Sequence, residues 1–193
     1  MGPIRREQIC RAASTVIARE GFSGTTMRVV ADEAGVSTGM LNHYFANRQD
    51  LLMHALDFVS ERAHGRMVQA LDGIPPGRER LTALLDAVLA DGEDQDAGET
   101  WRVWINAYGE AVRLPELRHT IESRLTSWYE LIDSALEGVV PSEPPGAIPW
   151  SWRLDAILNG LAIRALTSES ALDSVQIRDE VIRTLLHEVP AEA

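Results

Sequence analysis

The chain has 193 residues, which is long enough for one core and at most a small second module. Its net charge of -11 excludes a protein whose whole surface binds nucleic acid or a membrane through bulk positive charge. The charge is unevenly distributed: residues 1–54 carry six Arg against five acidic residues (+1), and the remaining residues carry 12 Arg against 24 (-12). We expect two segments with separate functions.

Cysteine usage and the lengths of the apolar runs indicate the cellular setting. Cys10 is the one cysteine, so neither an internal disulfide framework nor a cysteine-based metal site can form. No apolar run is long enough for a signal peptide or a transmembrane helix. We therefore expect a cytoplasmic protein without a metal or a cofactor.

Apolar residues recur at spacings of 3, 4 and 7 between Gly and Pro breaks, and no segment has a convincing strand pattern. The pattern predicts an all-α protein of about nine helices. An acidic loop is expected over 91–99. The expected helices cover about 5–20, 26–34, 38–44, 48–71, some 14 residues after Gly77, 99–112, 115–138, 150–168 and 174–187.

Several helix ends have recognisable signals. Gly21 is expected to end the first helix in a left-handed conformation. Thr25 or Thr26 is expected to cap the second helix, Ser37 the third and Asn47 the fourth, since these side chains accept hydrogen bonds from free helical N–H groups.

The segment 26–45 carries the strongest functional signal. Two short helices separated by a turn at Gly35 have the spacing of a helix-turn-helix, although a generic pair of short core helices is an alternative. The second helix begins at a cap and combines short with hydrogen-bonding residues, which suit base contacts in a major groove. These residues are Thr38, Gly39, Met40, Asn42 and His43.

Three motifs in this region, at 21–28, 30–37 and 41–52, resemble the TetR family of one-component transcriptional regulators. The resemblance implies a three-helix DNA-binding domain over 1–47 and a helical domain for ligand binding and dimerisation over 48–193. Because the N-terminal 54 residues carry only +1, affinity for DNA must rest on a few Arg, the helix ends and two-fold repetition, so we expect a homodimer that binds a near-palindromic operator of double-stranded DNA.

The same resemblance implies roles for individual residues. Asn42 is the best candidate for bidentate pairing with adenine. Tyr44 and Arg48 are expected to hold phosphates, although partial burial of Tyr44 is an alternative, and family members commonly have Lys at the position of Arg48. The complete predicted DNA-binding set is Thr26, Arg28, Ser37, Thr38, Gly39, Met40, Asn42, His43, Tyr44 and Arg48.

The C-terminal two thirds has no catalytic constellation, and three aromatic residues there share one helix face. Trp101, Trp104 and Tyr108 are spaced by 3 and 4, which is compatible with a core stripe or with a ligand pocket. The segment 101–117 resembles the choline-responsive, BetI-like repressor branch of the TetR family, in which this helix lines the inducer cavity. The predicted ligand-binding residues are Phe58, Met67, Trp101, Trp104, Ile105, Tyr108 and Trp128.

Aromatic faces together with acids such as Glu110 and Glu130 suit a cationic inducer. The family resemblance also implies dimer contacts in the last two helices, where Gly160 either permits close helix approach or relieves crowding inside the monomer. The predicted interface residues are Leu154, Ile157, Leu158, Leu161, Ile177 and Val181.

The expected function is repression relieved by a small-molecule inducer, with activation as an alternative. The second hypothesis is a helical small-molecule-binding or catalytic protein whose N-terminal head is only structural.

Overall fold

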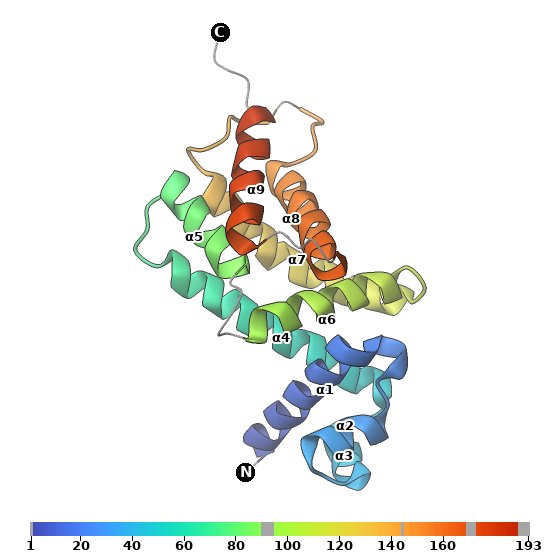
Figure 1. The fold of residues 1–193 in the computed structure, drawn as a ribbon. Helices are drawn as coiled ribbons and strands as arrows, with labels where there is room; N and C mark the ends of the chain where they lie inside the picture. Colours follow the sequence, from blue (N-terminus) through green and yellow to red (C-terminus); the bar gives the residue numbers. More distant parts are fainter. Residues whose placement is uncertain (1, 90–94, 144, 169–172, 189–193) are drawn as a thin grey trace. The chain divides into compact units, whose positions relative to one another are not determined.

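The computed structural model describes residues 2–89, 95–143, 145–168 and 173–188, and within these ranges the regular structure is entirely helical (Figure 1). The helices are α1 (Gly2–Gly24), α2 (Met27–Ala34), α3 (Thr38–Tyr44), α4 (Arg48–Leu71), α5 (Arg78–Leu89), α6 (Gln95–Ala111), α7 (Pro115–Leu136), α8 (Trp150–Thr167) and α9 (Ser174–Glu188).

The predicted helix pattern is confirmed in number and order, with two differences at helix ends. Gly21 has φ 72° and ψ 174°, so it interrupts the helix as expected, but one further turn extends α1 to Gly24. Helix α6 begins at Gln95 rather than near residue 99. Part of the expected acidic loop, residues 91–94, lies outside the described residues.

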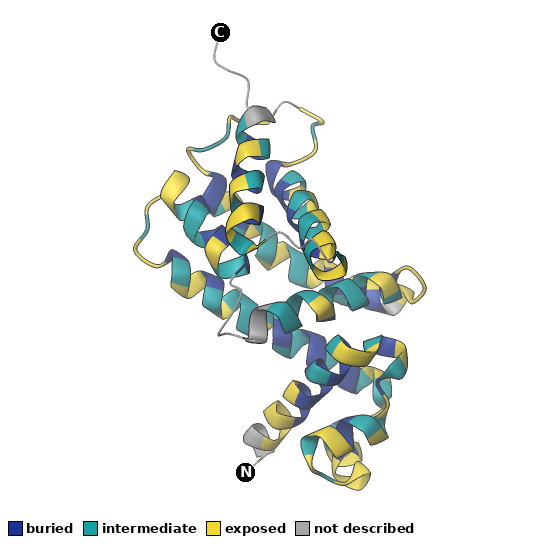
Figure 2. Ribbon diagram, in the orientation of Figure 1, coloured by how far each residue is buried: buried dark blue, intermediate teal, exposed yellow. Residues whose placement is uncertain are grey.

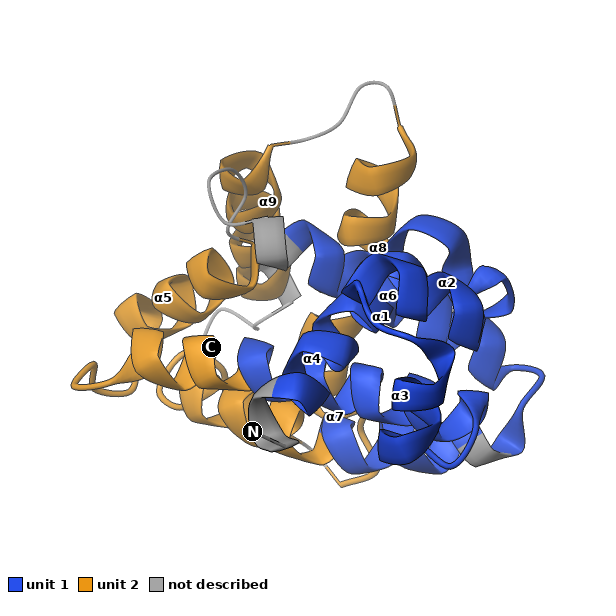
Figure 3. Cartoon of the chain, turned by 90° about the horizontal axis from the view of Figure 1, so that it is seen from below, with its two compact units in different colours: residues 1–63, 98–125 blue, residues 64–97, 126–193 orange. Residues whose placement is uncertain are grey.

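Two compact units make up the chain (Figure 3). Unit 1 contains residues 1–63 and 98–125, and unit 2 contains residues 64–97 and 126–193. The three boundaries along the chain, at 63/64, 97/98 and 125/126, therefore fall inside α4, α6 and α7. Packing joins the start of α4, most of α6 and the first half of α7 to the N-terminal helices, which the predicted division at residue 47 did not anticipate.

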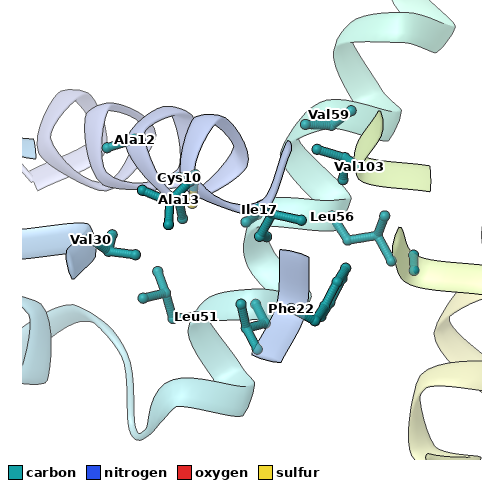
Figure 4. Packing of buried hydrophobic residues seen from close by; sticks show 14 of the residues in the cluster. Cys10, Ala12, Ala13, Ile17, Phe22, Val30, Leu51, Leu56, Val59 and Val103 are labelled. Carbon is teal, nitrogen blue, oxygen red and sulfur yellow. The ribbon is translucent and has the colours of Figure 1, made fainter. Parts of the chain in front are cut away.

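The core of unit 1 is formed by the apolar faces of α1, α2, α3, α4, α6 and α7 (Figures 2 and 4). Ile9, Ile17 and Leu51 have no exposed surface, and burial of each such side chain contributes about 1.5–3 kcal/mol. Helix α6 contributes a stripe at i, i+4 and i+8 to this core, namely Val103, Ala107 and Ala111.

A polar contact also joins α6 to α1. The Glu99 carboxylate lies 2.5 Å from Ser14 Oγ and accepts a hydrogen bond of 3.1 Å from Thr15 Oγ1. Because Ser14 is completely buried, this contact is a specific polar tie between the two helices within unit 1.

The core of unit 2 is formed by α5, the second half of α7, α8 and α9. Helix α9 contacts both α5 and α8. Arg80 of α5 donates to the backbone carbonyl oxygens of Leu71 (2.8 Å) and Ile74 (2.7 Å) and thus holds the turn after α4. Buried residues of this unit include Leu81, Leu84, Leu85, Ile132, Leu136, Leu154, Leu158, Ile177, Val181 and Leu185.

Within the ranges given above, none of the helices combines the length and apolar character needed to cross a bilayer.

Candidate nucleic-acid interface

Helices α2 and α3 are joined by a tight turn whose geometry follows from Gly35. This residue has φ 65° and ψ 35°, a left-handed conformation that glycine adopts without a steric penalty. Its N–H donates to the carbonyl of Asp32 (3.2 Å), and the N–H of Val36 donates to Ala31 (3.0 Å). The turn ends α2 and permits α3 to begin three residues after Gly35, as in a helix-turn-helix.

Side-chain caps begin α2, α3 and α4 at residues that the sequence predicted. Thr26 Oγ1 accepts a hydrogen bond of 3.2 Å from the N–H of Val29, and Ser37 Oγ accepts one of 3.2 Å from Met40. Asn47 Oδ1 accepts one of 2.9 Å from Asp50 at the start of α4. Such caps typically stabilise a helix by about 0.5–2 kcal/mol.

The outer face of α3 is exposed while its inner face is anchored. Leu41 has no exposed surface, and the adjacent Phe45 is 1% exposed. Tyr44 is half-buried, and its ring lies edge-on to His43 with 5.3 Å between centroids. The five residues predicted for base contacts are all exposed: Thr38, Gly39, Met40, Asn42 and His43.

Gly39 is not required by the fold of the chain itself. A Cβ atom added there would meet only Ser37 Oγ, at 3.8 Å, which is an ordinary contact. A glycine on an exposed helix lowers helix stability by about 1 kcal/mol relative to alanine. Its presence on the outer face of α3 is thus suited to a close backbone approach to a partner.

The guanidinium of Arg48 forms two hydrogen bonds with backbone carbonyl groups of unit 1. Its Nε donates to the carbonyl oxygen of Thr25 (2.6 Å), and its Nη2 donates to the carbonyl oxygen of Phe22. These hydrogen bonds tie α4 to the α1–α2 junction, and the phosphate contact of Arg48 stays a prediction. Sequence reasoning missed the tie because it connects residues more than 20 positions apart.

Arg28 is the arginine of the helix-turn-helix that remains most available. Its side chain is 86% exposed, and its ion pair with Asp32 has a long N–O distance of 4.0 Å. Arg19, by contrast, contacts both Glu33 and Glu20, and these hydrogen bonds raise the pKa of its guanidinium. Arg28 is therefore the best-placed cation for a phosphate or groove contact.

The connection between α3 and α4 is held by a small polar network. Asp50 accepts a hydrogen bond of 2.9 Å from the N–H of Ala46, and His54 Nδ1 lies 2.8 Å from the carbonyl oxygen of Asp50. The other ring nitrogen of His54 contacts the Arg6 guanidinium, which also lies over the Phe45 ring at 5.6 Å. The sequence did not predict this role for His54.

The predicted ligand-binding residues are divided between the two units. In unit 1, Trp104 and Tyr108 are half-buried with ring centroids 5.6 Å apart, beside the core stripe of α6 rather than in it. Phe58 has the guanidinium groups of Arg11 (5.4 Å) and Arg62 (5.5 Å) near its ring. The remaining members are Trp101 and Ile105 in unit 1 and Met67 and Trp128 in unit 2.

In unit 2, Trp128 Nε1 donates a hydrogen bond of 2.6 Å to Asp155, a partner that the sequence did not predict. An open groove of about 520 Å³ in the same unit contains none of the predicted ligand residues. It is lined by Arg78, Asp179, Ile182, Arg183 and Leu186. Within the described residues, no group of three or more His, Cys, Asp or Glu is placed to hold a metal ion.

The predicted dimer residues differ in their exposure. Leu154, Leu158 and Val181 have no exposed surface, and Ile177 is 3% exposed, so these four side chains belong to the core of unit 2. Residues without exposed surface add little area to a contact with a second copy, and the interface assignment of these residues stays a prediction. Ile157 and Leu161 are half-buried.

Gly160 is exposed, and an added Cβ would meet nothing within 4 Å. The alternative in which Gly160 relieves crowding inside the monomer is therefore wrong. The exposed apolar residues near this position are Ile163 and Leu166 of α8 and Val175 of α9.

Comparison with known proteins agrees with this geometry. Residues 9–55 match the family described as bacterial regulatory proteins, tetR family, and residues 76–190 match the C-terminal domain of BetI-type transcriptional repressors. A capped, exposed helix-turn-helix followed by a helical body defines a DNA-binding transcriptional regulator, and the chain belongs to the TetR family. Its C-terminal part is of the BetI type, and the chain is a ligand-responsive transcriptional regulator.

Individual relatives support the assignment. The BetI regulator of Rhizobium meliloti (strain 1021) is 33% identical over 121 residues, which is 63% of this chain and 59% of that protein. The BetI regulator of Agrobacterium fabrum is 30% identical over 164 residues, which is 85% of this chain and 78% of that protein. A transcriptional regulator from Saccharomonospora viridis, solved in complex with choline, superposes with a TM-score of 0.81 at 25% identity, covering 97% and 98% of the two chains.

Proposed function

We propose that the chain is a homodimeric repressor that binds a near-palindromic operator through α3 and is released from it by a small cationic inducer. The observation that carries the DNA-binding part is the outer face of α3. It presents Asn42 and four other exposed residues on a helix whose inner residue Leu41 is completely buried. A rigid helix with exposed hydrogen-bonding groups is what direct readout of base edges in the major groove requires.

Dimerisation is proposed because a single head lacks the charge for tight binding. Residues 1–54 carry a net charge of only +1, so the non-specific attraction to phosphates is weak. Two heads on a two-fold axis double the number of base and phosphate contacts. Ile163 and Leu166 on α8 form an exposed apolar surface, adjacent in sequence to Gly160, that suits contact between two copies.

The cationic inducer is proposed from charge and from the choline-bound relative. Unit 2 contains 7 Arg and 18 Asp or Glu, so it carries the entire net charge of -11. Such a field raises the local concentration of small cations. An inducer that binds better to a conformation with the wrong spacing of the two heads weakens operator binding by the same coupling factor.

The test is fluorescence anisotropy with labelled duplexes from the DNA that flanks the gene. We expect specific binding, a footprint of two half-sites about one helical turn or a multiple apart, and a loss of about 1–3 kcal/mol in binding free energy for Asn42→Ala. Ser142→Ala, an exposed change in the connection between α7 and α8, is the matched control. Absence of sequence-specific binding to any flanking duplex contradicts the operator proposal.

The inducer part is tested by titrating choline into the preformed protein–DNA complex. We expect choline to weaken operator binding, and equal binding at saturating choline contradicts the choline-like version of the proposal. Light scattering of the free protein measures the oligomeric state separately.

A further inference from the structure

A carboxylate of α8 lies among aromatic side chains of α7 and α8 inside unit 2. Asp155 Oδ1 accepts the 2.6 Å hydrogen bond from Trp128 Nε1, and the Tyr129 hydroxyl also hydrogen-bonds to the Asp155 carboxylate. The Tyr129 and Trp152 rings are neighbours, with 5.9 Å between centroids and an interplanar angle of 32°. We call Trp128, Tyr129, Trp152 and Asp155 the aromatic–carboxylate cluster.

The cluster holds a negative charge that no described residue neutralises. Asp155 forms no ion pair within the described part of the chain, and its hydrogen-bond donors are the neutral side chains of Trp128, Asn159 and Tyr129. Burial raises the pKa of Asp155, which shows that its charged form is poorly solvated. A cation placed beside this carboxylate would compensate for the lost hydration.

The cluster is accessible from solvent. Trp152 is 55% exposed, and Tyr129, Trp128 and Asp155 are half-buried. The guanidinium of Arg153, the residue after Trp152, lies over the ring of Trp150, 4.4 Å from its centroid. The faces of Tyr129 and Trp152 therefore offer a π surface next to the charge.

The hydrogen-bonding state of the carboxylate favours one type of cation. An ionised carboxylate has about four acceptor positions, and Trp128, Asn159 and Tyr129 occupy three of them. A primary ammonium ion needs acceptors for three N–H groups, whereas a quaternary ammonium ion needs only charge and aromatic faces. The arrangement thus suits a quaternary ammonium group better than a primary one.

We infer that Asp155, Trp128, Tyr129 and Trp152 form a binding site for a small quaternary ammonium ion, with Asp155 as its counter-charge. This inference deepens the proposed function, because its regulatory meaning rests on the proposal of a cationic inducer. It assigns the charge recognition to Asp155 rather than to Glu110 or Glu130. It also adds Asp155, Tyr129 and Trp152 to the predicted ligand residues.

The test uses isothermal titration calorimetry of the full chain with choline, tetramethylammonium and ethanolamine. Asp155→Asn removes the charge and keeps an oxygen acceptor for Trp128 Nε1, so a purely structural role is preserved in this variant. Trp152→Leu removes an exposed π face. Asp133→Asn, which removes an exposed charge one turn further along α7, is the matched control.

We expect the wild-type chain to bind choline and tetramethylammonium more tightly than ethanolamine. Asp155→Asn and Trp152→Leu should each weaken binding about tenfold or more, and Asp133→Asn should change it less than about twofold. Thermal unfolding and light scattering of every variant show that fold and oligomeric state are retained. Unchanged choline affinity of Asp155→Asn overturns the inference, and so does a preference for ethanolamine.

Failure of this inference is distinguishable from failure of the proposed function. If choline binds and releases operator DNA equally in wild type and Asp155→Asn, the inducer proposal holds and the cluster is only a packing contact. If none of the three cations binds the wild-type chain, the inference and the cationic version of the inducer are both overturned. Operator binding is measured without ligand and is unaffected by either result.

Discussion

The Nε atom of Arg48 lies 2.6 Å from the backbone carbonyl oxygen of Thr25, so the first residue of α4 is tied to the junction between α1 and α2. The second hydrogen bond of the same guanidinium reaches Phe22, the last buried residue of α1. One fork-shaped side chain thereby joins the segment before the helix-turn-helix to the helix that follows it. A lysine, with a single ammonium group, does not reproduce this fork geometry.

We therefore predict that Arg48→Ala, which removes the charge together with the fork, destabilises the chain without removing a phosphate contact. The free energy of unfolding should fall by about 1–3 kcal/mol, the usual value for hydrogen bonds made by a charged donor. The dependence of operator affinity on salt concentration should keep its slope. Chemical denaturation and anisotropy titrations at several salt concentrations measure the two quantities.

Arg28→Ala is the comparison for this prediction, because the Arg28 side chain is exposed and its ion pair with Asp32 is long. Stability should change by less than about 0.5 kcal/mol, while the salt slope should become shallower by about 0.9 for each lost phosphate contact. A reversed pattern, with a stable Arg48→Ala protein and a shallower slope, would support Arg48 as a phosphate ligand.

The second prediction concerns Gly39 on the outer face of α3. Gly39→Ala should raise the stability of the free protein by up to about 1 kcal/mol, since alanine favours a helix and the added Cβ meets only an ordinary contact. Operator affinity should fall at the same time, because the methyl group prevents close approach of the backbone to the duplex. Thermal unfolding and anisotropy of one preparation test both directions, and unchanged affinity contradicts the proposed approach.

A third prediction addresses dimerisation through α8. Ile163→Arg places a charge on the exposed apolar surface and should yield a folded monomer that no longer holds operator DNA at micromolar concentration. Leu161→Arg tests the half-buried neighbour, which the sequence also assigned to this contact. Gln69→Arg, an exposed change on α4, is the control. Light scattering that still shows a dimer for Ile163→Arg would exclude this surface.

The fourth prediction follows from the burial of Cys10. The residue is 5% exposed, and burial raises the pKa of its thiol to about 11 from a usual value of 9. Because the folded-state pKa lies above the unfolded one, the contribution of this thiol to stability is complete below pH 9 and is lost as the pH rises through 11. We expect slow reaction with a thiol reagent at pH 8 in the folded protein and rapid reaction after unfolding. Rapid labelling of the native protein would show that the site opens readily.

Local signals in the sequence were sufficient to predict the order of the helices and the helix-turn-helix. Thr26, Ser37 and Gly35 act on their own neighbours, two to four residues away, so their effects follow from residue type and spacing alone. The exposed face of α3 was predictable for the same reason, because Leu41 is the branched apolar residue of a helix whose other members are mainly short or polar. These features need no knowledge of distant parts of the chain.

Only the tertiary structure decided which side chains are used for packing or hydrogen bonds within the chain. The stripe of α6 that enters the core is Val103, Ala107 and Ala111, beside the aromatic stripe and not part of it. Likewise Leu154 is buried against its own unit, and Asp155 meets Trp128 from another helix. The helical period shows that residues share a face, but the helix that covers this face is set by packing between segments far apart in sequence.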